Sequence, residues 1–230
     1  MDQVEISPRE SVRDIGVVFD QNLSSESHIN NIVRQCNCNI RNIYSIRKNL
    51  DIDSTKSLVN AMVSSRVDYC CSLFLSLPNK QLKKLQVILN EAARMIFKLG
   101  PRESATPLQI TLHWLPIKAR IEFKICLITY KVLKFKEPSY LYNLLSFYSN
   151  ESSMELRLSN DTFRLNEPRA VGEKHLFSRS YSYAAPRFYN KLPLALKSID
   201  STDTFKSQLK THIFSKAYTP SGEISPEYQV

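Results

Sequence analysis

Residues 78–99, PNKQLKKLQVILNEAARMIFKL, carry the clearest pattern in the 230-residue chain. Each residue of an α-helix is rotated by about 100° from its neighbour. This rotation gathers the apolar side chains of the stretch on one face: Leu82, Leu85, Leu89, Ala92, Ala93 and Ile96. The basic side chains return to the opposite face: Lys80, Lys83, Lys84, Arg94 and Lys98. The stretch therefore predicts an amphipathic helix with one buried and one cationic face, beginning near Pro78 and closed by Gly100 and Pro101.

Further helices are predicted on both sides of this one. Apolar residues at helical spacing from Ile29 to Ile46 follow possible caps at Ser24 or Ser25, and Asp53 or Ser54 can cap a second helix. Thr106 and Pro107 can begin a short helix, and Pro116 a long one that reaches Phe135. The long helix is apolar except for a stripe of four basic residues: Arg120, Lys124, Lys131 and Lys134. We expect it to lie centrally in the fold, with only that stripe facing solvent or a ligand.

The two ends of the chain have a different character. Residues 11–19 end in the run IGVVF, which is typical of a short buried strand. Residues 150–174 are polar and irregular, with possible short strands at 156–158 and 162–165 around a turn at 159–161. A helix interrupted near Pro186 is predicted within 177–189, and Asp203 can cap a last helix.

These elements together predict a mainly α fold. We expect a multi-helix bundle with a short N-terminal strand and a small irregular α+β subdomain near the C-terminus. The expected organisation is a strand remnant at 1–22, a basic helical domain at 23–148, the irregular and helical subdomain at 149–218, and a disordered tail at 219–230.

The positive charge is concentrated in one segment. The chain has a formal net charge of +9, from 31 basic and 22 acidic residues. Twelve of the basic residues but only three of the acidic ones lie between Pro78 and Lys136, so the remainder carries nineteen of each. Such a field indicates a polyanionic partner. Lysines on an exposed helix face can also simply be solvated, and that alternative stays open.

No pattern for catalysis or for a cofactor stands out. The histidines, His28, His113, His175 and His212, occur in unrelated contexts, and four glycines cannot form a phosphate-binding loop. The paired carboxylates that hold two metal ions in polymerases are missing: Asp51 with Asp53, and Asp200 with Asp203, lie where helix caps belong. The five cysteines have no zinc-finger spacing. We therefore expect no catalytic residues, no metal site and no cofactor.

Four long stretches resemble one family. They are VRDIGVVFDQNLSSESHI near the start, SRVDYCCSLFLSLPNKQLKKLQVILNEAARMIFK with LHWLPIKARIEFKICLITYKVL in the middle, and FSRSYSYAAPRFYNKLPLALKSIDSTDTFKSQLKTHIF near the end. In this order they are similar to the region that follows the catalytic palm in reverse transcriptases of LINE-type, non-LTR retrotransposons, jockey-like elements among them. The resemblance covers approximately residues 11–215. Tyr189 stands where many relatives have Trp.

This resemblance implies a thumb and C-terminal extension of an RNA-directed DNA polymerase, without the catalytic aspartates of the palm. We expect the chain to be no enzyme on its own and to retain non-specific binding of RNA or DNA through the phosphate backbone. The expected contacts are Lys80, Lys83, Lys84, Arg94, Lys98, Arg120, Lys124 and Lys131.

The absence of a palm suggests two further kinds of partner. A separate reverse-transcriptase palm is a possible partner, and an apolar surface left exposed without the palm would favour oligomers. The alternative function is a co-opted or non-functional helical protein-interaction module without affinity for nucleic acid. With no signal peptide and no long apolar run, we expect a nuclear or cytoplasmic protein that is neither secreted nor membrane-bound.

Overall fold

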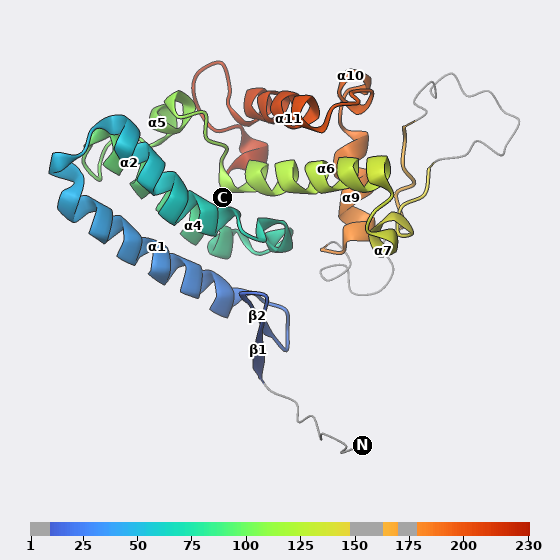
Figure 1. Cartoon of the computed structure of the whole chain (residues 1–230), viewed down its shortest axis with the longest axis horizontal. Helices are drawn as coiled ribbons and strands as arrows, with labels where there is room; N and C mark the ends of the chain where they lie inside the picture. The colour runs from blue at the N-terminus through green and yellow to red at the C-terminus, as the bar shows by residue number, and fades with distance from the viewer. Residues whose placement is uncertain (1–9, 148–162, 170–178) are drawn as a thin grey trace, which may run out of the picture. The chain divides into compact units, whose positions relative to one another are not determined.

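The computed structural model of the chain describes residues 10–147, 163–169 and 179–230. These residues are mainly helical, with a short two-stranded antiparallel sheet near the N-terminus (Figure 1), which confirms the predicted fold class. They divide into two compact units, each described here by itself. The first unit contains the described residues up to Cys70 and Leu77–Leu112, and the second contains Cys71–Ser76 and the described residues of His113–Gln229. The expected strand at 156–158 and the turn at 159–161 lie outside the described residues. Of the expected strand at 162–165, residues 163–165 are described and form no strand, and Leu165 makes a single antiparallel bridge with Phe147.

The division corrects the predicted domain boundary at 148/149. We expected one helical domain over 23–148, but the long helix that begins after Pro116 belongs to the second unit. Its apolar circumference is covered by helices from the C-terminal part of the chain. Hydrophobic periodicity shows that a helix is buried, but it does not show which other helices bury it.

The N-terminal sheet is a hairpin, where the sequence predicted a single strand. Strands β1 (Ser11–Asp14) and β2 (Val17–Asp20) pair antiparallel, with Val12 opposite Phe19. Ile15 and Gly16 form the turn, and both have positive φ, at 45° and 82°. Two successive positive φ angles are typical of the tight turns that match the twist of a hairpin. Tyr69 fixes this turn by donating a hydrogen bond of 2.6 Å from its hydroxyl to the Ile15 carbonyl oxygen.

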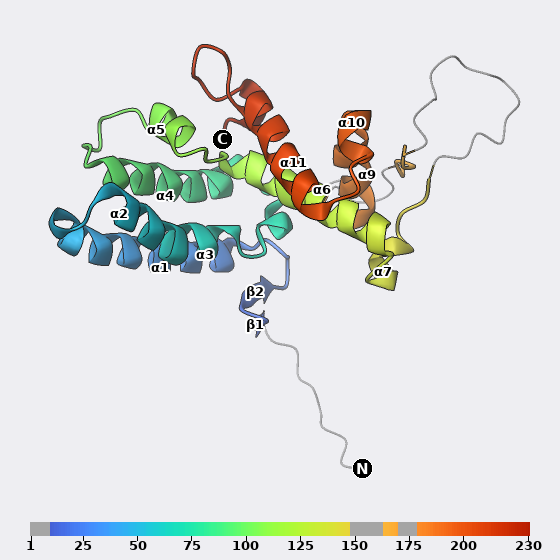
Figure 2. The same cartoon turned by 45° about the horizontal axis from the view of Figure 1, so that its top comes forward.

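The helices of the first unit enclose one apolar core. They are α1 (Glu26–Ile46), α2 (Ile52–Val59), α3 (Ser65–Asp68), α4 (Asn79–Phe97) and α5 (Thr106–Thr111), with a 3₁₀ turn at Arg47–Asn49 and a π-helical turn at Asn60–Ser64 between α2 and α3. Helices α1 and α4 run side by side in Figures 1 and 2 and contact each other along their apolar faces. Ile29, Val63 and Leu85 are among the side chains that are fully buried there.

The second unit is built around the long helix α6 (Ile117–Phe135). Around it lie a 3₁₀ turn at Cys71–Phe74 and helices α7 (Ser139–Tyr142), α9 (Tyr181–Asn190), α10 (Leu194–Lys197) and α11 (Thr202–Ala217). Helices α9 and α11 both pack on α6, as Figures 1 and 2 show, so its predicted central position is confirmed. Tyr130 stacks on Phe205 with ring centroids 3.8 Å apart, which joins α6 to α11.

Helix ends differ from the prediction at several places. Helix α4 ends at Phe97, and Lys98 takes the left-handed conformation (φ 56°), so the helix closes before the predicted Gly100 and Pro101. Leu99 N–H then bonds to the Arg94 carbonyl oxygen, the hydrogen bond that closes a Schellman motif. Ser201 caps α11 by accepting from Thr204 N–H, so the predicted Asp203 cap is wrong. Pro186 lies within α9 without ending it.

The C-terminal segment is ordered, where the sequence predicted a disordered tail at 219–230. It turns back through a bridge between Tyr218 and Ile224 and ends in a 3₁₀ turn at Pro226–Tyr228. Tyr228 is buried, and its hydroxyl donates a hydrogen bond of 2.7 Å to Glu122 Oε2 on α6. A polar segment can therefore be held by one aromatic anchor, which a composition argument does not detect.

Candidate nucleic-acid interface

Helix α4 carries the cationic face that the sequence predicted. All six predicted core residues, from Leu82 to Ile96, are buried, and Lys80, Lys83 and Lys98 on the opposite side are exposed. With a rise of about 1.5 Å per residue, Lys80 and Lys98 are separated by roughly 27 Å along the helix axis. Glu91 is exposed on the same side and reduces the local charge by one. The face is thus long enough to meet several phosphates of one strand.

Lys84 belongs to this face but is already engaged. Its ammonium donates a hydrogen bond of 2.7 Å to Asn30 Oδ1 and lies 3.5 Å from Glu26 Oε1, both on α1. A hydrogen bond from Gln81, and then the hydrogen bond and charge of Lys84, hold the pKa of Glu26 below its ordinary value. Lys84 therefore joins α1 to α4, and its ammonium is only partly available to a ligand.

Arg94 is likewise tied to its own unit. Its Nε donates a hydrogen bond of 2.8 Å to the carbonyl oxygen of Glu103, in the loop after α4. This contact holds the loop against the last turns of the helix. The remaining guanidinium N–H groups give Arg94 the geometry for a phosphate contact, because the planar group has five donors.

The basic stripe on α6 is shorter than expected. Arg120 is only 8% exposed; its Nε donates a hydrogen bond of 2.8 Å to the Leu115 carbonyl oxygen, and its guanidinium lies over the Trp114 ring. The expectation that Arg120 faces solvent is wrong, because the long aliphatic stem and planar head of arginine can pack inside a fold when the donors are satisfied. We exclude it from the interface.

The remaining stripe residues fall into two classes. Lys131 is exposed and Lys124 is half-buried. Lys134 pairs with Asp200: its ammonium lies 3.1 Å from Oδ1 and also bonds to the Asp200 backbone oxygen. The hydrogen bond from Lys134 to Asp200 raises the pKa of the lysine. Lys134 thus joins the segment before α11 to α6. Lys124 and Lys131 are the residues of the stripe that a ligand can contact.

The described titratable residues do not form a metal site. No group of three or more His, Cys, Asp or Glu in the described ranges is placed to hold a metal ion. His28 is buried, and its Nδ1 accepts a hydrogen bond of 3.4 Å from Val18 N–H, which fixes the hairpin to α1. His113 lies against Phe214, with ring centroids 5.5 Å apart. His175 lies outside the described residues.

One feature of the second unit was not found from the sequence. A pocket of about 310 Å³ lies between α6, α9, the α10–α11 connection and the residues that bracket 148–162. Four aromatic residues contribute to its wall: Tyr130, Phe147, Phe163 and Tyr189. The pocket collects aromatic rings from four separate segments, which no local pattern reveals.

Comparisons with known proteins give no identification. No described helix has both the length and the apolar character needed to cross a membrane. The chain matches no protein-family model, no curated protein and no solved structure.

Proposed function

We propose that this chain binds RNA or DNA through the phosphate backbone, without sequence preference, and that it derives from the thumb and C-terminal extension of a LINE-type reverse transcriptase. The observation that supports the proposal is the set of exposed lysines at α4 opposite its buried face: Lys80 and Lys83 in the first turns of the helix, and Lys98 directly after its last residue. These residues lie in the segment that holds the whole positive excess of the chain. Neutralised phosphates release their counterions, so the binding free energy comes largely from that release.

The contact set narrows from the eight residues that the sequence suggested. Lys80, Lys83 and Lys98 form the main contacts on α4, with Arg94 and Lys84 in secondary roles because each already bonds within its unit. Lys124 and Lys131 on α6 form a second set. Exposed, flexible lysines hold phosphates as point charges, so the proposal includes no base-specific contact by these residues.

The proposal is tested by binding titrations with a labelled blunt duplex. The affected variant combines Lys80→Ala, Lys83→Ala and Lys98→Ala; the matched control combines Arg41→Ala, Lys48→Ala and Lys206→Ala, which are exposed and remove the same charge. Each lost phosphate contact should lower the slope of log K against log salt by about 0.9. Between about 50 and 200 mM salt, the unmodified protein should therefore lose roughly 40-fold more affinity than the α4 variant. Equal behaviour of the α4 variant and the control would contradict the proposal.

A second candidate is a protein-interaction module, and the hairpin favours it. Val12 is 56% exposed and Ile15 is 81% exposed, and β1 has no neighbour other than β2 in the described sheet. A two-stranded hairpin with open edges can accept a further strand. This candidate predicts that molar mass measured by light scattering rises with protein concentration and that a charged residue at Val12 abolishes the rise.

The proposal assigns no polymerase chemistry to these residues. A primer-extension assay with the purified chain, a primed template and Mg²⁺ should give no product. Extension that survives removal of trace contaminants would show that the chain holds a catalytic site.

A further inference from the structure

We infer that the aromatic pocket of the second unit receives one unpaired nucleobase of a single-stranded segment. The inference rests on the proposed binding of nucleic acid, which it extends from the phosphate backbone to the bases. It concerns the second unit alone, whereas the main backbone contacts lie on α4 in the first unit.

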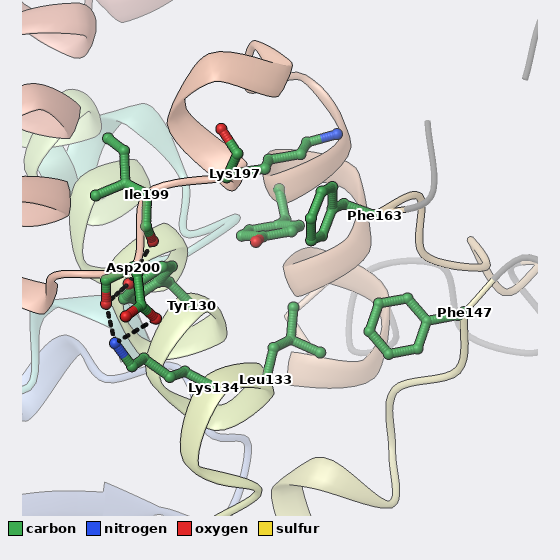
Figure 3. A pocket seen from close by; sticks show the side chains of 10 residues that line it. Tyr130, Leu133, Lys134, Phe147, Phe163, Lys197, Ile199 and Asp200 are labelled. Atoms are coloured by element: carbon green, nitrogen blue, oxygen red, sulfur yellow. Dashed lines mark hydrogen bonds and ion pairs between the residues drawn. The ribbon is translucent and has the colours of Figure 1, made fainter. Parts of the chain in front are cut away.

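The shape of the pocket suits one planar ring. Phe147 and Phe163 stand on one side in Figure 3, Tyr130 and Asp200 stand on the other, and Leu133 lies between them. The volume of about 310 Å³ is at the lower end for small-molecule sites, so the pocket has room for one base rather than for a stack of several. Aromatic walls are the surface on which single-stranded bases stack, since every base has a π face.

The aromatic walls differ in how firmly they are held. Tyr130 and Tyr189 are 4% and 2% exposed and form part of the core. Tyr130 is also fixed by hydrogen bonds from its hydroxyl to the backbone oxygens of Ile199 and Asp200, at 2.7 and 2.9 Å. Phe147 and Phe163 are 46% and 37% exposed, which is a large apolar area to leave in water. A stacked base would cover these two rings against a rigid wall.

The charge around the pocket is compatible with a polyanion. Asp200 is the one acidic residue among the described residues that line the pocket, and its pairing with Lys134 at 3.1 Å offsets its repulsion of a phosphate. Lys197 also lines the pocket; in Figure 3 its ammonium points away from Asp200. Lys131, one turn before Lys134 on α6, is exposed and can meet the backbone next to an inserted base. Lys197 is only 4% exposed, and its ammonium already donates a hydrogen bond of 3.4 Å to the Asn190 carbonyl oxygen. Among the described residues of this part of α6, Lys131 is therefore the cation that remains for a phosphate, and an apolar peptide side chain in the same volume would gain nothing from it.

The test uses two single strands of equal length and charge. One contains 2-aminopurine among ordinary bases, and the other replaces the bases by abasic sites while keeping every phosphate. The variant combines Phe147→Ala with Phe163→Ala; both residues are exposed, so the fold should tolerate their loss. The control combines Tyr44→Ala with Tyr140→Ala, which are 72% and 68% exposed and lie away from the pocket lining.

The expected result is selective. The pocket variant should bind the base-containing strand about 5- to 150-fold more weakly, which is the range for the loss of a base–aromatic stack. It should bind the abasic strand and the blunt duplex like the unmodified protein, and the quenching of 2-aminopurine should disappear with the two phenylalanines. The control should change none of these.

Two results would overturn the inference. One is an equal loss of affinity for the base-containing and the abasic strand, and the other is unchanged quenching in the pocket variant. The blunt duplex separates this inference from the proposed function, because duplex binding depends on the lysines of α4. The α4 variant and its control can show the same salt dependence of duplex binding while 2-aminopurine fluorescence is still quenched only when Phe147 and Phe163 are present. In that case the backbone proposal is wrong and the inference about the pocket stands.

Discussion

The guanidinium of Arg47 donates a hydrogen bond of 2.6 Å to the carbonyl oxygen of Ile96, in the last turn of α4. Its Nε also donates to the Met95 carbonyl oxygen at 3.0 Å, and Arg47 itself is only 4% exposed. A cation at the C-terminal end of a helix satisfies carbonyl groups that have no partner within the helix. Arg47 thereby fixes the helix that carries the cationic face to the turn that follows α1.

Replacing Arg47 by Met should strongly destabilise the first unit. The change keeps most of the aliphatic stem but removes the donor to the Ile96 carbonyl oxygen and leaves the Met95 carbonyl oxygen with Lys98 N–H alone, at 3.3 Å. It should lower the free energy of unfolding by about 2–4 kcal/mol. Urea denaturation followed by circular dichroism measures the loss. The matched control is Arg41→Met on the exposed side of α1, which should stay within about 0.5 kcal/mol. A similar midpoint for both variants would show that the Arg47 contacts add nothing to stability.

The turn of the hairpin offers a stabilising change. Ile15 has a φ of 45°, which is strained for a β-branched residue, and its side chain is 81% exposed, so it gives little packing in return. Ile15→Asn would place Asn-Gly at a turn that favours this pair, and we expect a gain of about 0.5–1 kcal/mol. Thermal unfolding of the two proteins measures it. Ile15→Val keeps the branching and should give no gain; a gain with Val as large as with Asn would refute strain as the cause.

The C-terminal anchor can be tested at one atom. Tyr228→Phe keeps the ring but removes the hydroxyl that bonds to the buried carboxylate of Glu122, whose side chain is otherwise met by the Lys216 ammonium at 3.7 Å. Losing the donor to a buried carboxylate should cost about 1–3 kcal/mol. Hydrogen exchange should show faster exchange in residues 218–229 of the variant, while the amides of α4 exchange as before. Fast exchange over 218–229 in the unmodified protein would mean that the segment is not held.

Stability should fall at mildly acidic pH because of His28. Burial, and then the positive charge of Arg13, lowers the pKa of His28 below 6.5. The unfolded chain therefore binds a proton at a higher pH than the folded chain, so stability is greatest above the unfolded pKa and falls as the pH drops below about 6.5. Burial also lowers the pKa of His212, so the second unit responds in the same direction.

Urea midpoints measured at pH 7.5 and 5.5 test this prediction. The difference between the two midpoints should shrink in His28→Gln, because glutamine does not titrate. An unchanged difference in His28→Gln would exclude His28 as the source.

The sequence predicted those parts of the fold that depend on local periodicity. The buried face of α4 from Leu82 to Ile96 was found because a helix turns each apolar residue to the same side. Arg120 was assigned wrongly, because its burial depends on Trp114 and Leu115 at the preceding bend, where its guanidinium finds partners. The C-terminal segment is held by contacts from distant residues, among them the bond from Tyr228 to Glu122 across a sequence separation of 106 residues and the bond from Lys118 to the Gln229 carbonyl oxygen. Contacts of that kind leave no mark on composition or spacing.

Adjacent residues on α4 provide the sharpest test of how the cationic face works. Lys83 is exposed and makes no side-chain hydrogen bond or ion pair with a described residue, whereas the Lys84 ammonium already bonds to Asn30 at 2.7 Å. Lys83→Ala should therefore lower the salt slope of duplex binding by about 1, and Lys84→Ala by clearly less. Asn30→Ala and Glu26→Gln together would release Lys84, and in that background Lys84→Ala should cost as much slope as Lys83→Ala. If the two single variants lose the same slope in the unmodified protein, then the contacts to α1 do not restrain Lys84, and all lysines of the face act as one diffuse charge.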